Sequence, residues 1–257
     1  MQTIFLTSFI GGFERTPEGK QITNINNSNH FIDRLKSIKD NWRSLVIVSS
    51  DPDGFAKSDE YANIFTKAFK LDGINIENVT ILDHRFKGNI EKTILDADVL
   101  FLNGGNTTTQ NKYLKEINLN AILPKFEGVI IGQSAGSMNL AKTVYVPPEY
   151  KEDLTDKYQR VFSGIGLTDI RIMPHMDTSF TDNVNGLGKN TIDYCLEDSY
   201  RYPMYGLYDY SFIEITPYKT TCFGKALLIK DGKFTKVCEN NESIEINNLY
   251  NDNENIK

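Results

Sequence analysis

Residues 127–141 read EGVIIGQSAGSMNLA, and this stretch predicts a strand, a sharp turn and a helix. Residues 129–131 form an apolar run suited to a buried strand, and residues 138–141 favour a helix. Glycines flank Ser134 in the order Gly-x-Ser-x-Gly. This pattern is typical of a sharp turn in which the serine backbone is strained and its hydroxyl is exposed. The amide groups at the start of the helix point to the same place. We therefore predict that Ser134 is a nucleophile, with a plain strand-to-helix turn as the alternative.

Other short apolar runs alternate with helical segments along the first half of the chain. The runs cover residues 3–9, 45–48, 79–82, 99–102 and 129–131. This alternation predicts an α/β fold, a three-layer sandwich with a mostly parallel sheet and helices on both faces. Asp231-Gly232 predicts a C-terminal antiparallel hairpin between residues 226–229 and 234–237.

The chain is expected to form one domain with a polar end. With 257 residues, of which 40% are hydrophobic, it can bury a full core, and we expect a single α/β domain over residues 1–238. Residues 239–257 are dominated by Asn and acidic residues and predict a frayed or loosely docked tail. The charged residues that follow Pro148 predict a surface excursion, with a lid over the site as one interpretation.

Composition narrows the class of partner. A formal net charge of -6 argues against nucleic acid or an anionic membrane as the main partner, and favours a small soluble substrate. No segment approaches the ~20 apolar residues of a membrane span, and the apolar residues 3–9 are interpreted as a first strand rather than a signal peptide. Three cysteines without C-x-x-C spacing suggest neither a disulfide framework nor a zinc site, so the cytoplasm is the expected location.

A serine hydroxyl needs a base, and the chain offers only three histidines. His175 follows the strand predicted at residues 170–173, Pro174 restricts the backbone before it, and it is the preferred base. His84 follows another predicted strand and is the alternative. His30 begins a predicted helix, where a cap or surface role is expected.

A carboxylate should orient the histidine, and backbone amides should hold the developing oxyanion. Asp209 lies at a strand end and is the preferred acid, with Asp177 and Glu149 as competitors. The Gly104-Gly105-Asn106 turn follows the apolar run 99–102 and allows close approach of its amides, so Gly105 and Ala135 are the candidate oxyanion donors. A simple tight turn is the alternative. A phosphate loop is disfavoured because the glycine spacing and lysine of such loops are missing.

Four segments in this order, FLNGGNT, GQSAGSMNLA, MPHMD and GLYDYSFIEI, resemble the peptidase E (aspartyl dipeptidase) and cyanophycinase family of serine peptidases. These proteins have class I glutamine amidotransferase-like folds in which serine replaces the elbow cysteine. The resemblance implies that Ser134 is the nucleophile and His175 the base. It places Asp209 where the family has a glutamate, and Glu149 nearest to an alternative acid described for peptidase E. Gly105 and Ala135 match its oxyanion donors.

The resemblance implies a serine peptidase that hydrolyses the amide bond of short peptides through an acyl-enzyme, without metal or cofactor. An N-terminal acidic residue is a candidate specificity, although the arginine that peptidase E uses to hold the aspartyl side chain has only Arg201 and Lys189 as counterparts here. The alternative is a catalytically inactive amidotransferase-like binding or interaction protein. Amidotransferase chemistry itself needs an elbow cysteine. The oligomeric state is left open, with a homodimer as one candidate.

Overall fold

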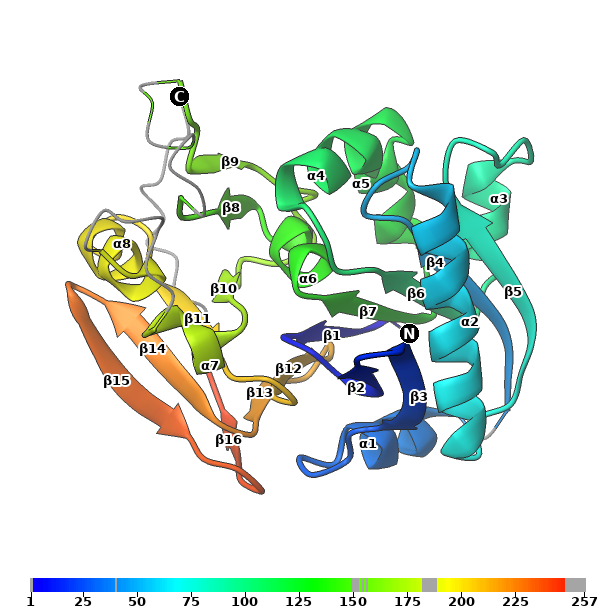
Figure 1. The fold of residues 1–257 in the computed structure, drawn as a ribbon, viewed down its shortest axis with the longest axis horizontal. Coiled ribbons are helices and arrows are strands. Elements are labelled where there is room, and N and C mark those ends of the chain that lie inside the picture. Colours follow the sequence, from blue (N-terminus) through cyan, green and yellow to red (C-terminus); the bar gives the residue numbers. More distant parts are fainter. Residues whose placement is uncertain are drawn as a thin grey trace.

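A central eight-stranded sheet organises the protein, as seen in a computed structural model (Figure 1) that describes residues 2–39, 41–148, 153, 155, 157–181 and 189–247. Its strand order is β16-β13-β12-β1-β7-β6-β4-β5. The parallel strands are β1 (Thr3–Thr7), β4 (Trp42–Val48), β5 (Ile76–Leu82), β6 (Val99–Leu102) and β7 (Val129–Gln133). The antiparallel strands are β12 (Phe212–Ile215), β13 (Thr220–Phe223) and β16 (Ser243–Glu245). The predicted mostly parallel sheet is confirmed.

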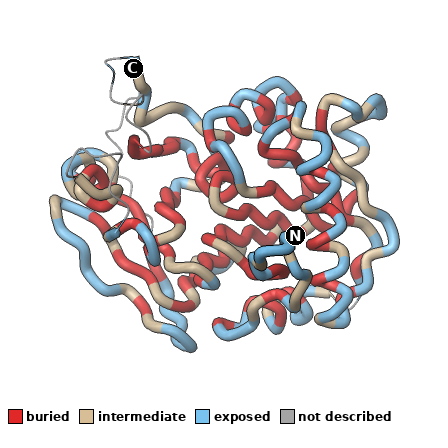
Figure 2. The backbone as a smooth tube through the Cα atoms, viewed as in Figure 1, coloured by how far each residue is buried: buried red, intermediate tan, exposed pale blue. Residues whose placement is uncertain are grey.

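Helices cover both faces of this sheet because its strands bury side chains alternately on each side. On one face, Phe5, Ile47 and Phe101 pack with the helices α1 (Phe31–Ile38) and α2 (Phe55–Leu71). On the other, Leu6 and Leu100 pack with α3 (Ile90–Leu95), α4 (Thr107–Glu116), α5 (Leu119–Ile122) and α6 (Ala135–Leu140). A short 3-10 helix, η1 (Leu123–Lys125), follows α5. Figure 2 shows that buried positions concentrate along the central strands.

A second, four-stranded sheet lies beside the first. Its order is β10 (Ile172–Met173), β11 (Met204–Leu207), β14 (Ala226–Lys230) and β15 (Lys233–Cys238). The short helices α7 (Met176–Ser179) and α8 (Thr191–Asp198) belong to this part of the chain. The predicted hairpin joins β14 and β15 through Asp231 and Gly232, which both have positive φ. The hairpin therefore belongs to this second sheet and does not extend the central one.

Two further β-hairpins lie outside both sheets. Strands β2 (Gly11–Thr16) and β3 (Gly19–Ile25) pair in a segment for which the sequence analysis gives no strand. The hairpin was missed because its outer positions are exposed and polar, so the apolar alternation that marks a strand is weak. Strands β8 (Thr143–Tyr145) and β9 (Val161–Ser163) form the other hairpin.

Two expectations concern segments near the ends of the described ranges. Within the segment predicted to be a loose tail, β16 pairs with β13, so residues 243–245 are part of the central sheet. This differs from the expectation because backbone pairing at a sheet edge does not require apolar side chains. Glu149 and most of the predicted surface excursion lie outside the described residues. Among the helices that are described, none combines the length and apolar character needed to cross a membrane.

Candidate active site

Ser134 lies in a strained turn between the central strand β7 and helix α6. Its φ of 50° and ψ of -113° fall outside the regions that L-residues ordinarily adopt. The flanking glycines are required by packing: a Cβ at Gly136 would lie 2.1 Å from the carbonyl oxygen of Leu102, and one at Gly132 would lie 2.7 Å from the backbone of Ser137. The strand, turn and helix predicted from the sequence are therefore present, and each glycine has a steric reason.

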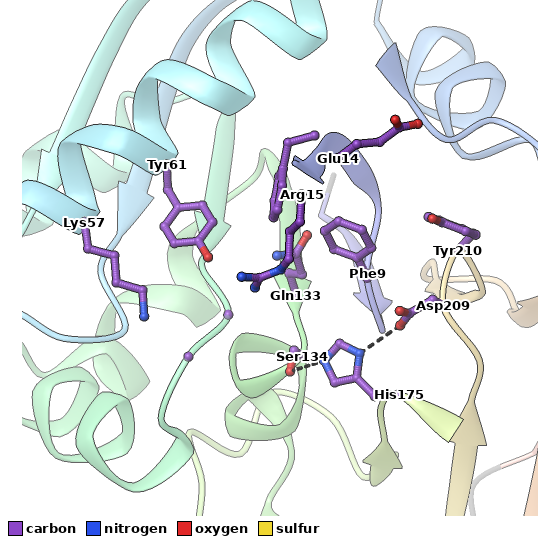
Figure 3. Close-up of a pocket in the computed structure, with 13 residues that line it drawn as sticks. Phe9, Glu14, Arg15, Lys57, Tyr61, Gln133, Ser134, His175, Asp209 and Tyr210 are labelled. Carbon is purple, nitrogen blue, oxygen red and sulfur yellow. Dashed lines mark hydrogen bonds and ion pairs between the residues drawn. The ribbon is translucent and has the colours of Figure 1, made fainter. Parts of the chain in front are cut away.

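Ser134, His175 and Asp209 form a continuous hydrogen-bonded chain (Figure 3). The Oγ atom of Ser134 is 3.0 Å from Nε2 of His175, and Nδ1 of His175 is 2.8 Å from Oδ1 of Asp209. A carboxylate beside Nδ1 favours the tautomer that carries its proton there, which leaves Nε2 free to accept the serine proton. Three residues separated widely in the sequence are thus arranged for proton removal from a serine hydroxyl.

The topology explains how these three residues meet. Strand β7 ends at the residue before Ser134, and the parallel pairing Thr7↔Gln133 places the end of β1 beside it. The N–H of Ser134 donates to the carbonyl oxygen of Thr7 at 2.9 Å. His175 and Asp209 follow β10 and β11, which are parallel neighbours in the second sheet. The site therefore lies where strand ends of the two sheets converge.

Ser8, buried directly after β1, connects the histidine to the acid. Its hydroxyl donates to Oδ1 of Asp209 at 2.7 Å and accepts the backbone N–H of His175 at 2.8 Å. The backbone N–H of Asp209 donates to Oδ2 of Asp177 at 2.6 Å. Asp177, a competing acid in the sequence analysis, thus supports the backbone of Asp209. Asp209 reaches the imidazole from this held position.

The surroundings of Asp209 favour its ionised form. Burial alone would raise the pKa of its carboxyl group, but the hydrogen bond and charge of His175, with the hydrogen bond from Ser8, hold that pKa below its usual value. An ionised Asp209 can stabilise the imidazolium that forms when His175 accepts a proton.

A pocket of about 810 Å³ opens above Ser134. The loop residues Gly104 and Gly105 line it together with Ser134 and His175. A Cβ at Gly105 would lie 2.2 Å from Oγ of Ser50, so only glycine fits there. The rest of the lining is aromatic and charged: Phe9, Phe13, Glu14, Arg15, Lys57, Tyr61, Gln133, Asp209 and Tyr210. Phe13, Glu14 and Arg15 come from β2, and Lys57 and Tyr61 come from the first two turns of α2. These segments carry no motif, so their part of the lining was not predicted.

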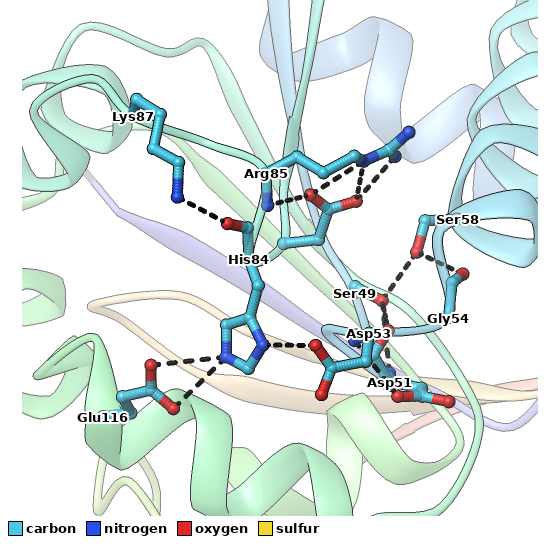
Figure 4. Close-up of polar contacts among 10 residues, drawn as sticks. Ser49, Asp51, Asp53, Gly54, Ser58, His84, Arg85, Lys87 and Glu116 are labelled. Carbon is cyan, nitrogen blue, oxygen red and sulfur yellow. Dashed lines mark hydrogen bonds and ion pairs between the residues drawn. The ribbon is translucent and has the colours of Figure 1, made fainter.

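The other two histidines lie in different surroundings. His84 contacts Asp53 through Nδ1 at 2.7 Å and Glu116 through Nε2 at 3.4 Å (Figure 4), and the Asp53 hydrogen bond raises its pKa. His30 precedes α1, with Nδ1 3.0 Å from Oδ2 of Asp33. Of the three histidines, the structure places His175 beside Ser134 and places His84 and His30 elsewhere.

The two residues considered as counterparts of the aspartyl-binding arginine also lie elsewhere. Lys189 forms an ion pair with Glu197, and the guanidinium of Arg201 lies over the ring of Tyr202 at 5.2 Å. Neither lines the pocket at Ser134.

An α/β fold with a serine, a histidine and an aspartate linked in this way defines the class of serine hydrolases. The family model of peptidase family S51 matches residues 26–221. The chain belongs to this family, the peptidase E family, and is a serine-type peptidase.

Solved structures support the fold assignment. A crystal structure of a peptidase from an acI-B1 actinobacterium has a TM-score of 0.67 and 15% identity, covering 96% of this chain and 97% of that chain. A 1.5 Å crystal structure of a putative peptidase E protein from Listeria monocytogenes EGD-e has a TM-score of 0.55 and 17% identity, covering 92% and 99%. At these identities the likeness concerns the fold alone. The comparison with curated proteins found no match.

Proposed function

We propose that this serine peptidase hydrolyses the amide bond of short peptides through an acyl-enzyme, with Ser134, His175 and Asp209 as its catalytic triad. The observation that carries the proposal is the unbroken chain of contacts from the Ser134 hydroxyl through the imidazole to the Asp209 carboxylate. Asp209 is the proposed acid because it contacts the imidazole directly, whereas Glu149 lies outside the described residues.

The geometry suggests the role of each group. Nε2 of His175 removes the proton of Ser134 as Oγ attacks the peptide carbonyl carbon, and Asp209 stabilises the resulting imidazolium. The backbone amides of Gly105 and Ala135 are the proposed donors to the oxyanion. His175 then gives its proton to the leaving amine, which leaves an ester on Ser134. A water molecule, deprotonated by His175, attacks this ester and releases the acid product.

Short peptides are the proposed substrates because the pocket has the volume of a small-molecule site. A volume of about 810 Å³ lies within the ~300–1,000 Å³ of ligand pockets and would hold a peptide of a few residues. A dipeptidase-like activity, with an acidic N-terminal residue as one candidate preference, is consistent with this size.

A dipeptide library tests the proposal and the substrate class together. The parent should hydrolyse a subset of dipeptides, and Ser134→Ala should lower kcat by about 10⁴-fold or more, since triad knockouts remove most of the rate enhancement. Ser37→Ala, at an exposed helical serine, is the matched control and should retain parental rates. A Ser134→Ala variant that hydrolyses peptides as fast as the parent contradicts the proposal. A well-folded parent that hydrolyses none would favour the inactive binding protein.

A further inference from the structure

Two positively charged side chains, Arg15 and Lys57, line the pocket that holds Ser134. Arg15 is on β2 near the turn of the β2–β3 hairpin, and Lys57 is near the start of α2. Figure 3 shows both side chains directed into the pocket, on the side of Ser134 that faces away from His175. The two cations therefore lie across the reacting serine from the proposed base.

Neither cation is neutralised by the residues around it. In the described part of the chain, no ion pair or hydrogen bond joins the side chain of Arg15 or of Lys57 to another residue. The neighbouring acid, Glu14, also lines the pocket, but its carboxylate is directed away from the guanidinium of Arg15 (Figure 3). Glu60, one turn along α2 from Lys57, pairs with Lys20 at 2.6 Å. The positive charge of this wall is therefore available to a ligand.

Packing holds the hairpin against α2 and keeps the two cations in one wall. The ring of Phe13 meets that of Tyr61 at 6.1 Å, and the ammonium of Lys20 lies 4.2 Å from the centre of the Tyr61 ring. Tyr61 itself lines the pocket one turn after Lys57. Because the hairpin and α2 are already packed together without substrate, ordering them costs little conformational entropy when the substrate binds.

We propose that Arg15 and Lys57 form a carboxylate-binding subsite for the peptide substrate. A guanidinium can bind a carboxylate through two parallel hydrogen bonds, and an ammonium adds a second positive charge. In a dipeptide the carboxylate comes either from an acidic N-terminal side chain or from the free C-terminus. The inference rests on the proposed function, because it assigns the substrate of the same pocket. The subsite differs from one built from the segment that follows His175 in the chain, because the two cations considered there, Lys189 and Arg201, do not line the pocket.

Binding to Ser134→Ala tests the subsite without requiring turnover. Calorimetry would compare Asp-Leu with Asn-Leu, which removes the side-chain carboxylate, and with Asp-Leu amide, which removes the terminal one. At least one of the two neutral analogues should bind about tenfold more weakly than Asp-Leu, and the affected analogue identifies the source of the carboxylate. Adding Arg15→Gln and Lys57→Gln should abolish this difference. Lys67→Gln, at an exposed lysine elsewhere on α2, is the control and should preserve it.

Two results would overturn the subsite: equal binding of all three peptides, including no measurable binding, or a preference that persists when both cations are replaced. The parent, assayed in parallel for hydrolysis of the same peptides, reports on the proposed function separately. If Ser134→Ala shows the carboxylate preference while the parent hydrolyses no peptide, the subsite stands and the proposed function fails. If the parent hydrolyses all three peptides equally and binding shows no preference, the proposed function stands and the subsite fails.

Discussion

Replacing Ser8 by alanine tests whether the end of β1 positions the histidine and its acid. The Ser8 hydroxyl donates to Asp209 at 2.7 Å and accepts the N–H of His175 at 2.8 Å, and the side chain is fully buried. Ser8→Ala removes both contacts without adding bulk. Because Ser8 does not line the substrate pocket, its effect on catalysis would act through His175 and Asp209.

The size of the effect follows from the two hydrogen bonds. A hydrogen bond to a charged group contributes about 1.5–3 kcal/mol, and a buried donor left without a partner costs about 1–3 kcal/mol. Since the two contacts share one hydroxyl and are not additive, we expect the free energy of unfolding to fall by about 2–4 kcal/mol. A less well-held imidazole should lower kcat by about tenfold to a hundredfold, with a smaller change in KM.

Urea unfolding and steady-state kinetics on a cleaved dipeptide measure the two effects. The matched control is Ser199→Ala: Ser199 is also fully buried, and its hydroxyl donates to the carbonyl of Leu196 and accepts the N–H of Gly232. This control should lose stability and keep the parental kcat under native conditions. If Ser8→Ala and Ser199→Ala were equally destabilised and both retained parental kcat, the positioning role of Ser8 would be refuted.

Three further predictions concern the acid, the turn and the second histidine. Asp209→Asn should lower kcat by about 10³–10⁴-fold by favouring the wrong imidazole tautomer. Since the folded pKa of Asp209 is lowered, its stabilising charge is present above about pH 4 and lost as pH falls through the folded pKa, so urea unfolding of parent and Asp209→Asn should converge in acid. Gly136→Ala should destabilise the fold by about 3 kcal/mol, measurable as a lower Tm, because its Cβ would meet the Leu102 carbonyl at 2.1 Å. His84→Gln should leave kcat unchanged, and because the folded pKa of His84 is raised, its stability deficit should be larger near pH 5.5 than near pH 8.5.

Much of the site was predictable because its signals are local. The Gly-x-Ser-x-Gly turn has a steric basis that depends only on neighbouring strand and helix, so Ser134 could be assigned from one short stretch. His175 and Asp209 each follow a predicted strand, and polar residues at strand ends are the usual site residues of α/β folds. The family match to residues 26–221 confirms the peptidase class that the four motifs implied.

The remaining features depend on pairing that the sequence does not encode locally. His84 also follows a strand, but β5 is the edge strand, with β4 and β6 between it and β7, so strand order separates His84 from Ser134. The separation of the second sheet was not predicted, because apolar runs do not specify their partners. Ser8, Arg15 and Lys57 gave no signal, since a polar residue after a strand, on a hairpin or on the exposed side of a helix is ordinary in any sequence.

Labelling with a fluorophosphonate probe, followed by mass-spectrometric location of the adduct, tests the central claim most directly. Such probes react with a serine whose hydroxyl is activated by a neighbouring base. We predict a single adduct on Ser134 in the parent, and strongly reduced labelling in His175→Ala, whose fold is checked by circular dichroism. A folded parent that remains unlabelled, or an adduct on a serine other than Ser134, would contradict the account.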